Sequence, residues 1–401
     1  MDKIIFHIDV NSAFLSWSAV SALESGQDED LRLIPAIVGG DSSKRHGIVL
    51  AKSIPAKAYG IETGEPVANA LRKCPFLKMV SPDFSVYKEK SRAFISYLAG
   101  LCPEIEQVSI DECYMDFTPI AHLYSSPHEA AVIIKDTIRE KFGFTVNVGI
   151  SDKKVLAKMA SDFQKPDKVH TLFSYEIRDK MWPLPVSSLY MCGKSSVEAL
   201  KKLEILTIGD LANADPSIIE AHLKSLGLLL HHYANGIDDS VVEPEPVKRK
   251  GVGNSITLSH DLTTRDEAGH TLLELAESVG TRLRKEKDLA GVICIEIKYN
   301  TFKSVSHQMA IYTPTSSTDA LYRAAMTLFD ALWDHTPIRL LGLRTSKLVN
   351  EDAPIQLSLF DMMDAKPVSE KQQKLNAALD QIRNRYGSDS VKRGSMLSPD
   401  K

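Results

Sequence analysis

The 401-residue sequence lacks the hallmarks of several protein classes. Its five cysteines are scattered, odd in number and never spaced C-x-x-C, which argues against a disulfide framework and a cysteine zinc site. No apolar run approaches the ~18 residues that a membrane span needs, and the N-terminus has no signal-peptide pattern. Basic charge is not in excess, because the formal net charge is −4. Any surface for an anionic partner must therefore be a local patch. From the cysteine pattern we expect free thiols and a cytoplasmic protein.

What is present indicates a folded protein with several cores. Hydrophobic residues make up 43% and charged residues 25%, an ordinary globular composition, and the length predicts about two to four domains. Up to Pro166, strand-like and helix-like segments are mixed, which predicts an α+β core. Residues 184–236 resemble short helices broken by glycine and proline, residues 238–250 have linker composition, and residues 251–349 form a second α+β pattern.

Three acidic residues stand in segments that otherwise look like buried strands. Asp9 lies near the end of the apolar segment 3–10, and Asp111 and Glu112 lie within the β-prone segment 108–117. A buried carboxylate is costly unless hydrogen bonds or a cation satisfy it. Carboxylates that share two divalent cations are a standard device for in-line phosphoryl displacement.

The alternative is that Asp9 caps the following helix and that Asp111 and Glu112 mark a hairpin turn. Spacing alone favours this alternative. Neighbouring strand residues also point to opposite faces, so Asp111 and Glu112 can converge only if the strand bends or ends there.

Five ordered motifs change this balance. They resemble those of Y-family translesion DNA polymerases, in the branch that includes DNA polymerase IV and UmuC: FHIDVNSAF at 6–14, VGGDSSKRHG at 38–47, AKAYGI at 56–61, SIDECYMD at 109–116 and GISDKKVLAKMA at 149–160. Their order and spacing are those of the family, and the resemblance covers most of residues 1–349. We therefore prefer the metal-binding interpretation of the three acids.

The resemblance implies an α+β fold with the right-hand architecture of polymerases. The implied domains are the palm (1–25 and 79–168), small fingers (26–78), a helical thumb with a helix-hairpin-helix (169–236), a linker (237–250), a little finger (251–349) and a tail with a clamp-binding motif and a terminal helix (350–401).

The resemblance also implies a metal site. Asp9, Asp111 and Glu112 fall where the family holds two Mg²⁺ ions, for which Mn²⁺ can substitute, and the backbone carbonyl of Val10 would complete one site. In such a site one ion lowers the pKa of the primer 3′-hydroxyl and the other holds the triphosphate.

Three further positions correspond to nucleotide-binding residues of the family. Phe14 matches the steric gate that excludes a 2′-hydroxyl, and Lys165 matches a lysine that reaches the incoming deoxynucleoside triphosphate. Without the family context, Phe14 would be a core residue of the first helix and Lys165 a surface lysine. The fingers depart from the family pattern, because Ile54 and Lys57 replace the usual tyrosine and arginine. Lys57 keeps the charge of arginine without its bidentate fork.

DNA contacts are expected in two regions. The thumb segment around Gly193 and Lys194 resembles a helix-hairpin-helix, which presents backbone N–H groups to a phosphate. Residues 247–349 carry 14 Lys/Arg and 11 Asp/Glu, a net charge of +3 within an acidic protein. The expected backbone contacts there are Lys248, Arg249, Lys250, Arg344 and Lys347.

The polar tail contains a short segment that resembles the sliding-clamp-binding peptide of bacterial polymerases. Its residues are Gln356, Leu357, Ser358, Leu359 and Phe360. Large apolar side chains in a polar tail favour a partner's pocket.

The resemblance implies a DNA-directed DNA polymerase that extends primers past damaged template bases at low fidelity, and we expect it to lack proofreading. We expect a monomer that binds primer-template DNA and no membrane, and that is associated with the nucleoid when engaged. Two alternatives are a catalytically weak, polymerase-like scaffold recruited by the clamp and a palm-domain nucleotidyl cyclase. The intact acids argue against the first, and the thumb, little finger and clamp-like tail argue against the second.

Overall fold

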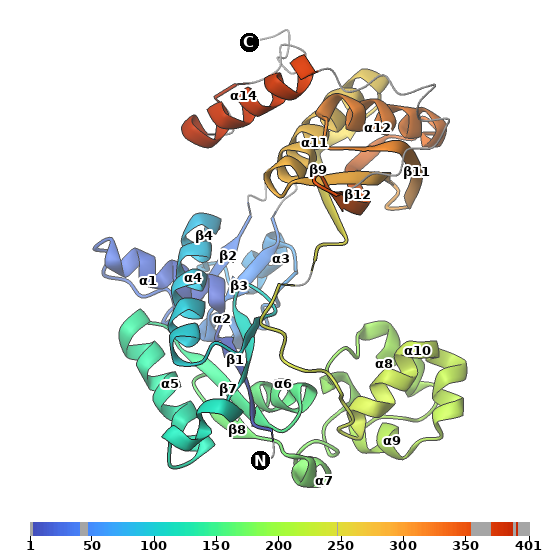
Figure 1. Ribbon diagram of the computed structural model, residues 1–401. Coiled ribbons are helices and arrows are strands. Elements are labelled where there is room, and N and C mark those ends of the chain that lie inside the picture. The colour runs from blue at the N-terminus through green and yellow to red at the C-terminus, as the bar shows by residue number, and fades with distance from the viewer. Residues whose placement is uncertain (1–2, 41–46, 247, 354–369, 388–389, 392–401) are drawn as a thin grey trace. The chain divides into compact units, whose positions relative to one another are not determined.

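The computed structural model describes residues 3–40, 47–246, 248–353, 370–387 and 390–391. The chain divides into two compact units, Met1–Ser42 with Gly47–Pro246 and Ser43–His46 with Val247–Lys401. Sheets and helices occur in both units (Figure 1), so the predicted α+β class is confirmed. In the described part of the chain, no helix is both long and apolar enough to cross a bilayer.

The first unit is built on a five-stranded sheet in the order β5-β6-β1-β7-β8. Its strands are β1 (Ile5–Val10), β5 (Ile105–Gln107), β6 (Glu112–Asp116), β7 (Val146–Ser151) and β8 (Val169–Thr171). The central strand β1 runs antiparallel to both β6 and β7. The helices that pack around this sheet (Figure 1) are α1 (Ala13–Glu24), α4 (Phe84–Leu101), α5 (Pro127–Phe142) and α6 (Lys154–Asp162).

The two faces of β1 serve different purposes. Because side chains alternate along a strand, one set joins the large hydrophobic core with α1, α4 and α5: Phe6, Ile8 and Val10. The other set faces α6 and the segment after it: Ile5, His7 and Asp9. The second face therefore combines a buried apolar contact with the polar residues of the candidate site.

A glycine lets α6 lie directly on the sheet. A Cβ atom at Gly149 would stand 2.0 Å from the Ala157 carbonyl oxygen and 2.5 Å from the Ser161 nitrogen. We therefore expect Gly149→Ala to lower the free energy of unfolding by roughly 1–3 kcal/mol, since α6 must move off β7. The measurement is urea-induced unfolding of the full chain. Gly100→Ala is the matched control because a Cβ there has no atom within 4 Å, and an equal loss in that variant would contradict the explanation.

The remainder of the first unit contains a small sheet and a helical region. The small sheet has the order β3-β2-β4, formed by β2 (Ala36–Gly39), β3 (Val49–Lys52) and β4 (Lys78–Val80), and it packs with α2 (Ile54–Ala58) and α3 (Val67–Lys73). The helical region contains α7 (Ile177–Lys180), α8 (Lys194–Lys201), α9 (Ile208–Asn213) and α10 (Pro216–Ala234). Its hydrophobic core includes Val155 and Leu156 of α6, so α6 joins this region to the five-stranded sheet.

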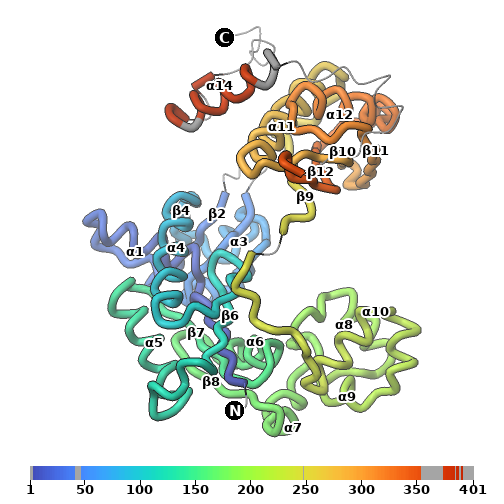
Figure 2. Tube along the Cα trace, viewed as in Figure 1, coloured from blue at the N-terminus to red at the C-terminus, as the bar shows by residue number. Residues whose placement is uncertain are grey.

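The second unit has its own four-stranded sheet in the order β11-β10-β12-β9. Figure 2 follows its chain trace through β9 (Gly251–Leu262), α11 (Arg265–Lys285), β10 (Asp288–Tyr299), β11 (Ser304–Thr315), α12 (Thr318–Leu332) and β12 (Ile338–Asn350). Helices α11 and α12 pack against the sheet and against each other around one core.

A terminal helix, α14 (Glu370–Tyr386), attaches to α11 mainly through polar contacts. Arg284 Nε lies 2.6 Å from Asp380 Oδ2, and Arg383 Nη2 lies 2.9 Å from Glu277 Oε2. Leu375 keeps 49% of its surface exposed. The helix is therefore held by ion pairs and contributes little to the hydrophobic core of this unit.

Candidate active site

The backbone brings the three predicted acids to one place on the five-stranded sheet. Asp9 of β1 is the direct partner of Glu112 on β6, and the Val10 N–H donates to the Asp111 carbonyl oxygen at 3.0 Å. The β-prone segment 108–117 is not a strand throughout, because β5 ends at Gln107 and β6 begins only at Glu112. The chain turns between them, as the hairpin alternative expected for Asp111. Asp111 lies in the connecting turn, so it is not forced to point away from Glu112 as a strand neighbour would be.

The electrostatics of Asp111 reflect this proximity. Burial raises the pKa of its carboxyl group, and the negative charges of Asp9 and Glu112 raise it further. The Ser109 hydroxyl, which donates to Asp111 Oδ1 at 2.5 Å, acts in the opposite direction. The three acids therefore create a local negative potential that favours cations.

Two lysines already contact these acids. The ammonium group of Lys165 pairs with Asp9 and lies 2.9 Å from Asp162 Oδ1, and Lys158 Nζ of α6 lies 2.7 Å from Glu112 Oε2. Burial alone would lower the pKa of each lysine, but the neighbouring carboxylates outweigh it and raise both pKa values. Lys165 is therefore charged at the position from which an anionic group could be bound.

A histidine that the sequence analysis did not select also contacts Glu112. His7 Nε2 lies 3.2 Å from Glu112 Oε2, and this contact is the main cause that lowers the pKa of Glu112 to about 2, with Lys158 acting in the same direction and burial opposing. Burial lowers the pKa of His7 itself. The signal in the sequence was a polar residue two positions before Asp9 in an apolar strand, because such residues share one face.

The donor set suits a hard divalent cation, although it is not arranged as a closed cage. Among the residues that the structure describes, no three His, Cys, Asp or Glu side chains are grouped as metal ligands usually are. Asp9 and Glu112 instead face ammonium groups. Carboxylate oxygens are the ligands that Mg²⁺ prefers, and a cation would offset the burial and the repulsion by Asp9 and Glu112 that raise the pKa of Asp111.

Phe14 lies at the start of α1, where its ring is half-buried. It stacks on Tyr87 with 4.6 Å between centroids and an interplanar angle of 13°. Ser12, two residues earlier, is exposed, and its backbone adopts the left-handed conformation with φ of 48°. Half-burial is compatible with both interpretations of Phe14, as a packing residue and as a gate. In the fingers region, Lys57 and Ile54 are both exposed on α2.

The predicted DNA contacts are all exposed, and they belong to both units. In the first unit, Gly193 directly precedes α8 and Lys194 begins it. Met191, two residues before Gly193, adopts the left-handed conformation that favours glycine, with φ of 64°.

In the second unit, Lys248, Arg249 and Lys250 precede β9, and Arg249 pairs with Glu286 at 3.2 Å. Arg344 and Lys347 are exposed on β12. Arg344 also borders a hollow of about 290 Å³ on the sheet that includes residues of β9, β10 and β12. The predicted clamp-binding residues Gln356, Leu357, Leu359 and Phe360 lie outside the described residues.

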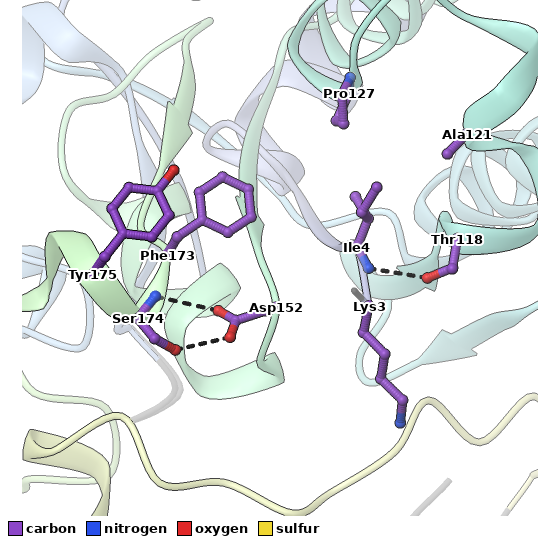
Figure 3. A pocket seen from close by; sticks show the side chains of 9 residues that line it. All are labelled: Lys3, Ile4, Thr118, Ala121, Pro127, Asp152, Phe173, Ser174 and Tyr175. Atoms are coloured by element: carbon purple, nitrogen blue, oxygen red, sulfur yellow. Dashed lines mark hydrogen bonds between the residues drawn. The ribbon is translucent and has the colours of Figure 1, made fainter. Parts of the chain in front are cut away.

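A larger hollow of about 480 Å³ contains none of the predicted site residues. Figure 3 shows its lining, in which Asp152 accepts hydrogen bonds from the backbone and hydroxyl of Ser174, with Phe173 and Tyr175 alongside. Because it lacks the three acids, this hollow is not the candidate active site.

Both the first and the last part of the chain match models of the same protein family. The model of the impB/mucB/samB family matches residues 8–162, and that of its C-terminal domain matches residues 249–359. The chain is 44% identical to DNA polymerase IV of Clostridium acetobutylicum, with 99% of each protein covered. It is 36% identical to DNA polymerase IV 1 of Bacillus subtilis, with 98% of this chain and 93% of that protein covered.

A solved structure shares the fold. A Y-family DNA polymerase chimera of Dbh and Dpo4 aligns with a TM-score of 0.77 and 22% identity, covering 86% of this chain and 99% of that one. At this identity the similarity concerns the fold, and it confirms the right-hand architecture that the motifs predict.

Proposed function

Because the chain belongs to the impB/mucB/samB family, the Y-family DNA polymerases, in the DNA polymerase IV branch, we propose that it extends primers past damaged template bases by two-metal nucleotidyl transfer. The predicted resemblance is confirmed by these matches, and the protein is a DNA-directed DNA polymerase of the translesion type. The two-metal mechanism, low fidelity, absence of proofreading and clamp recruitment are our proposals.

The observation that carries the mechanism is the pairing of Asp9 with Glu112 across β1 and β6, with Asp111 in the adjoining turn. We assign these three side chains and the Val10 carbonyl as the groups that would hold the metal ions. When bound, two Mg²⁺ ions would lower the pKa of the primer 3′-hydroxyl and neutralise charge on the triphosphate. Mn²⁺ can replace them.

The residues around the acids are suited to the other substrate groups. Lys165, whose pKa the neighbouring carboxylates raise, supplies a fixed positive charge for the triphosphate, and Lys57 supplies a second, exposed one. The half-buried ring of Phe14 is held by stacking on Tyr87, so it can resist displacement by a 2′-hydroxyl. Arg344 and Lys347, with Gly193 and Lys194 in the other unit, would follow the DNA backbone.

We retain the domain assignment made from the sequence: palm 1–25 and 79–168, fingers 26–78, thumb 169–236, linker 237–250, little finger 251–349 and tail 350–401. We also propose that synthesis proceeds without proofreading. We expect the protein to act as a monomer in the cytoplasm, on nucleoid DNA.

Primer extension on undamaged and damaged templates, in Mg²⁺ with the four deoxynucleoside triphosphates, tests the proposal. Template-directed extension past a lesion by the wild-type protein supports it. DNA binding without any extension would instead favour the catalytically weak scaffold, and formation of a cyclic nucleotide without DNA would favour a cyclase.

Clamp recruitment gives a separate prediction. We expect deletion of residues 356–360 to abolish the increase in processivity caused by the sliding clamp. Basal extension should be unchanged, because the deleted segment follows β12 in the sequence and includes none of the three acids. The product-length distribution with and without the clamp measures both effects. Deletion of residues 395–399 is the matched control, and an equal loss of basal and clamp-stimulated extension would contradict the assignment.

A further inference from the structure

One polar residue of the five-stranded sheet has no role in the proposed function so far. His7 is 0% exposed at the centre of β1, between α6 and β6. Its Nδ1 lies 2.8 Å from the Ser161 hydroxyl, and its Nε2 lies 3.2 Å from Glu112 Oε2. A fully buried imidazole is costly unless both nitrogens are satisfied. The cost of burying this ring therefore indicates a specific role for it.

The contacts of the two ring nitrogens determine which of them carries the hydrogen. A carboxylate can only accept a hydrogen bond, so the His7 nitrogen that faces Glu112 must carry the hydrogen. In the neutral ring, Nδ1 is then the acceptor, and the Ser161 hydroxyl donates to it. The Ser161 hydroxyl has only one hydrogen, so His7 Nδ1 competes for it with the Lys158 carbonyl oxygen, which lies 2.8 Å from the hydroxyl.

The ring is also held in place from other sides. Tyr114 packs edge-on against it with 4.8 Å between centroids. Ser161 belongs to α6, which Gly149 allows to lie on the sheet. The contact between Nε2 and Glu112 is at hydrogen-bond distance but off the ideal direction, and Nε2 has no other hydrogen-bond partner within the described ranges. Glu112 is therefore the group toward which this nitrogen is directed.

We propose that His7 is a positioning residue that, oriented by Ser161, fixes the carboxylate of Glu112 for binding a divalent cation. The inference rests on the proposed metal-binding role of Glu112 and deepens it. Hydrogen-bond partners behind a metal ligand set its orientation, and their loss commonly weakens metal affinity about 10- to 100-fold. Lys158 Nζ of α6 contacts the same Oε2 atom at 2.7 Å, so the His7 variants measure only the part of the orientation that the ring supplies.

The test is Mn²⁺ binding to the full-length protein, measured from the electron paramagnetic resonance signal of the free ion. We expect His7→Leu to weaken binding about 10- to 100-fold while the melting temperature stays equal or rises, because a buried polar group is replaced by an apolar one. His7→Gln, whose amide can donate to Glu112, should restore most of the affinity. His122→Leu, at an exposed position, is the matched control and should bind as the wild type does.

Wild-type Mn²⁺ affinity in folded His7→Leu would overturn the inference, and so would equal losses in His7→Gln and His7→Leu. If His7→Leu fails to fold, Ser161→Ala replaces it: a several-fold loss of affinity supports the role of the oriented ring, and an unchanged affinity overturns it. Asp111→Ala separates the two proposals. Unchanged Mn²⁺ binding in that variant would remove the metal site and this inference with it, whereas loss there with wild-type binding in His7→Leu would remove only the inference.

Discussion

Asp111→Ala should reduce the rate of primer extension by at least about a thousandfold, or ~4 kcal/mol in the activation barrier. The reason is that Asp111 contributes an oxygen donor beside Asp9 and Glu112, and no other described acid of the connecting turn can replace it. Single-turnover extension of a labelled primer measures the loss. Asp239→Ala, an exposed substitution in the same unit, should extend at the wild-type rate.

The same variant should not be less stable. The pKa of Asp111 is raised above its ordinary value by burial and by the charges of Asp9 and Glu112, so the ionised form opposes folding at neutral pH. Its removal should raise the melting temperature at pH 7. The increase should shrink as the pH falls through the raised pKa, because protonation removes the charge from the wild-type protein. Lost activity together with lost stability would indicate a structural role instead.

Phe14→Ala should change the sugar preference without abolishing synthesis. Removing the ring opens space beside the incoming sugar, so the ratio of kcat/KM for ribonucleotides to that for deoxynucleotides should rise by roughly 10- to 200-fold, the range for steric selection in an apolar pocket. Steady-state incorporation of matched pairs of triphosphates measures this ratio. The melting temperature should also fall, because the stacked contact with Tyr87 is lost.

Phe84→Ala is the matched control for the gate. Phe84 packs edge-on against Phe14 with 6.0 Å between centroids, so its removal disturbs the same aromatic group. The gate assignment requires that Phe84→Ala keep the wild-type sugar preference. If Phe14→Ala also keeps it, Phe14 is a packing residue of α1 and another side chain excludes the 2′-hydroxyl.

The sequence predicts elements whose hydrophobic pattern and ends are both clear. The apolar spacing of residues 128–142 predicts a helix, and the structure has α5 there, with Ser126 as its cap and Gly143 at its end. It does not predict where a β-prone segment is interrupted, because Val108 and Ile110 favour a strand and yet lie in the turn. Only the pairing of β5 with β6 requires the chain to reverse there.

Local residue type is also misleading where distant contacts compete. Asn11 and Ser12 are the kinds of residue that cap a helix, yet neither side chain caps α1. The side-chain oxygen of Asn11 instead accepts from the Thr145 hydroxyl and the Asp167 backbone. For the site, the order of the motifs predicts which acids bind the metal ions. The partners Lys158 and His7 depend on how α6 lies on the sheet, which a single sequence does not reveal.

The alternation of side chains along β1 has one more consequence. Its odd positions reach Glu112 and α6, and its even positions anchor the hydrophobic interior. A shift of the strand by a single residue would exchange these two sets, so the proposed metal site and the hydrophobic core depend on the same strand register. A protein with β1 shifted by one residue would not be stable, because Phe6 and Ile8 would face charged groups and Asp9 would enter the apolar interior. A chain that buries Phe6 and Ile8 in this core therefore also places Asp9 beside Glu112.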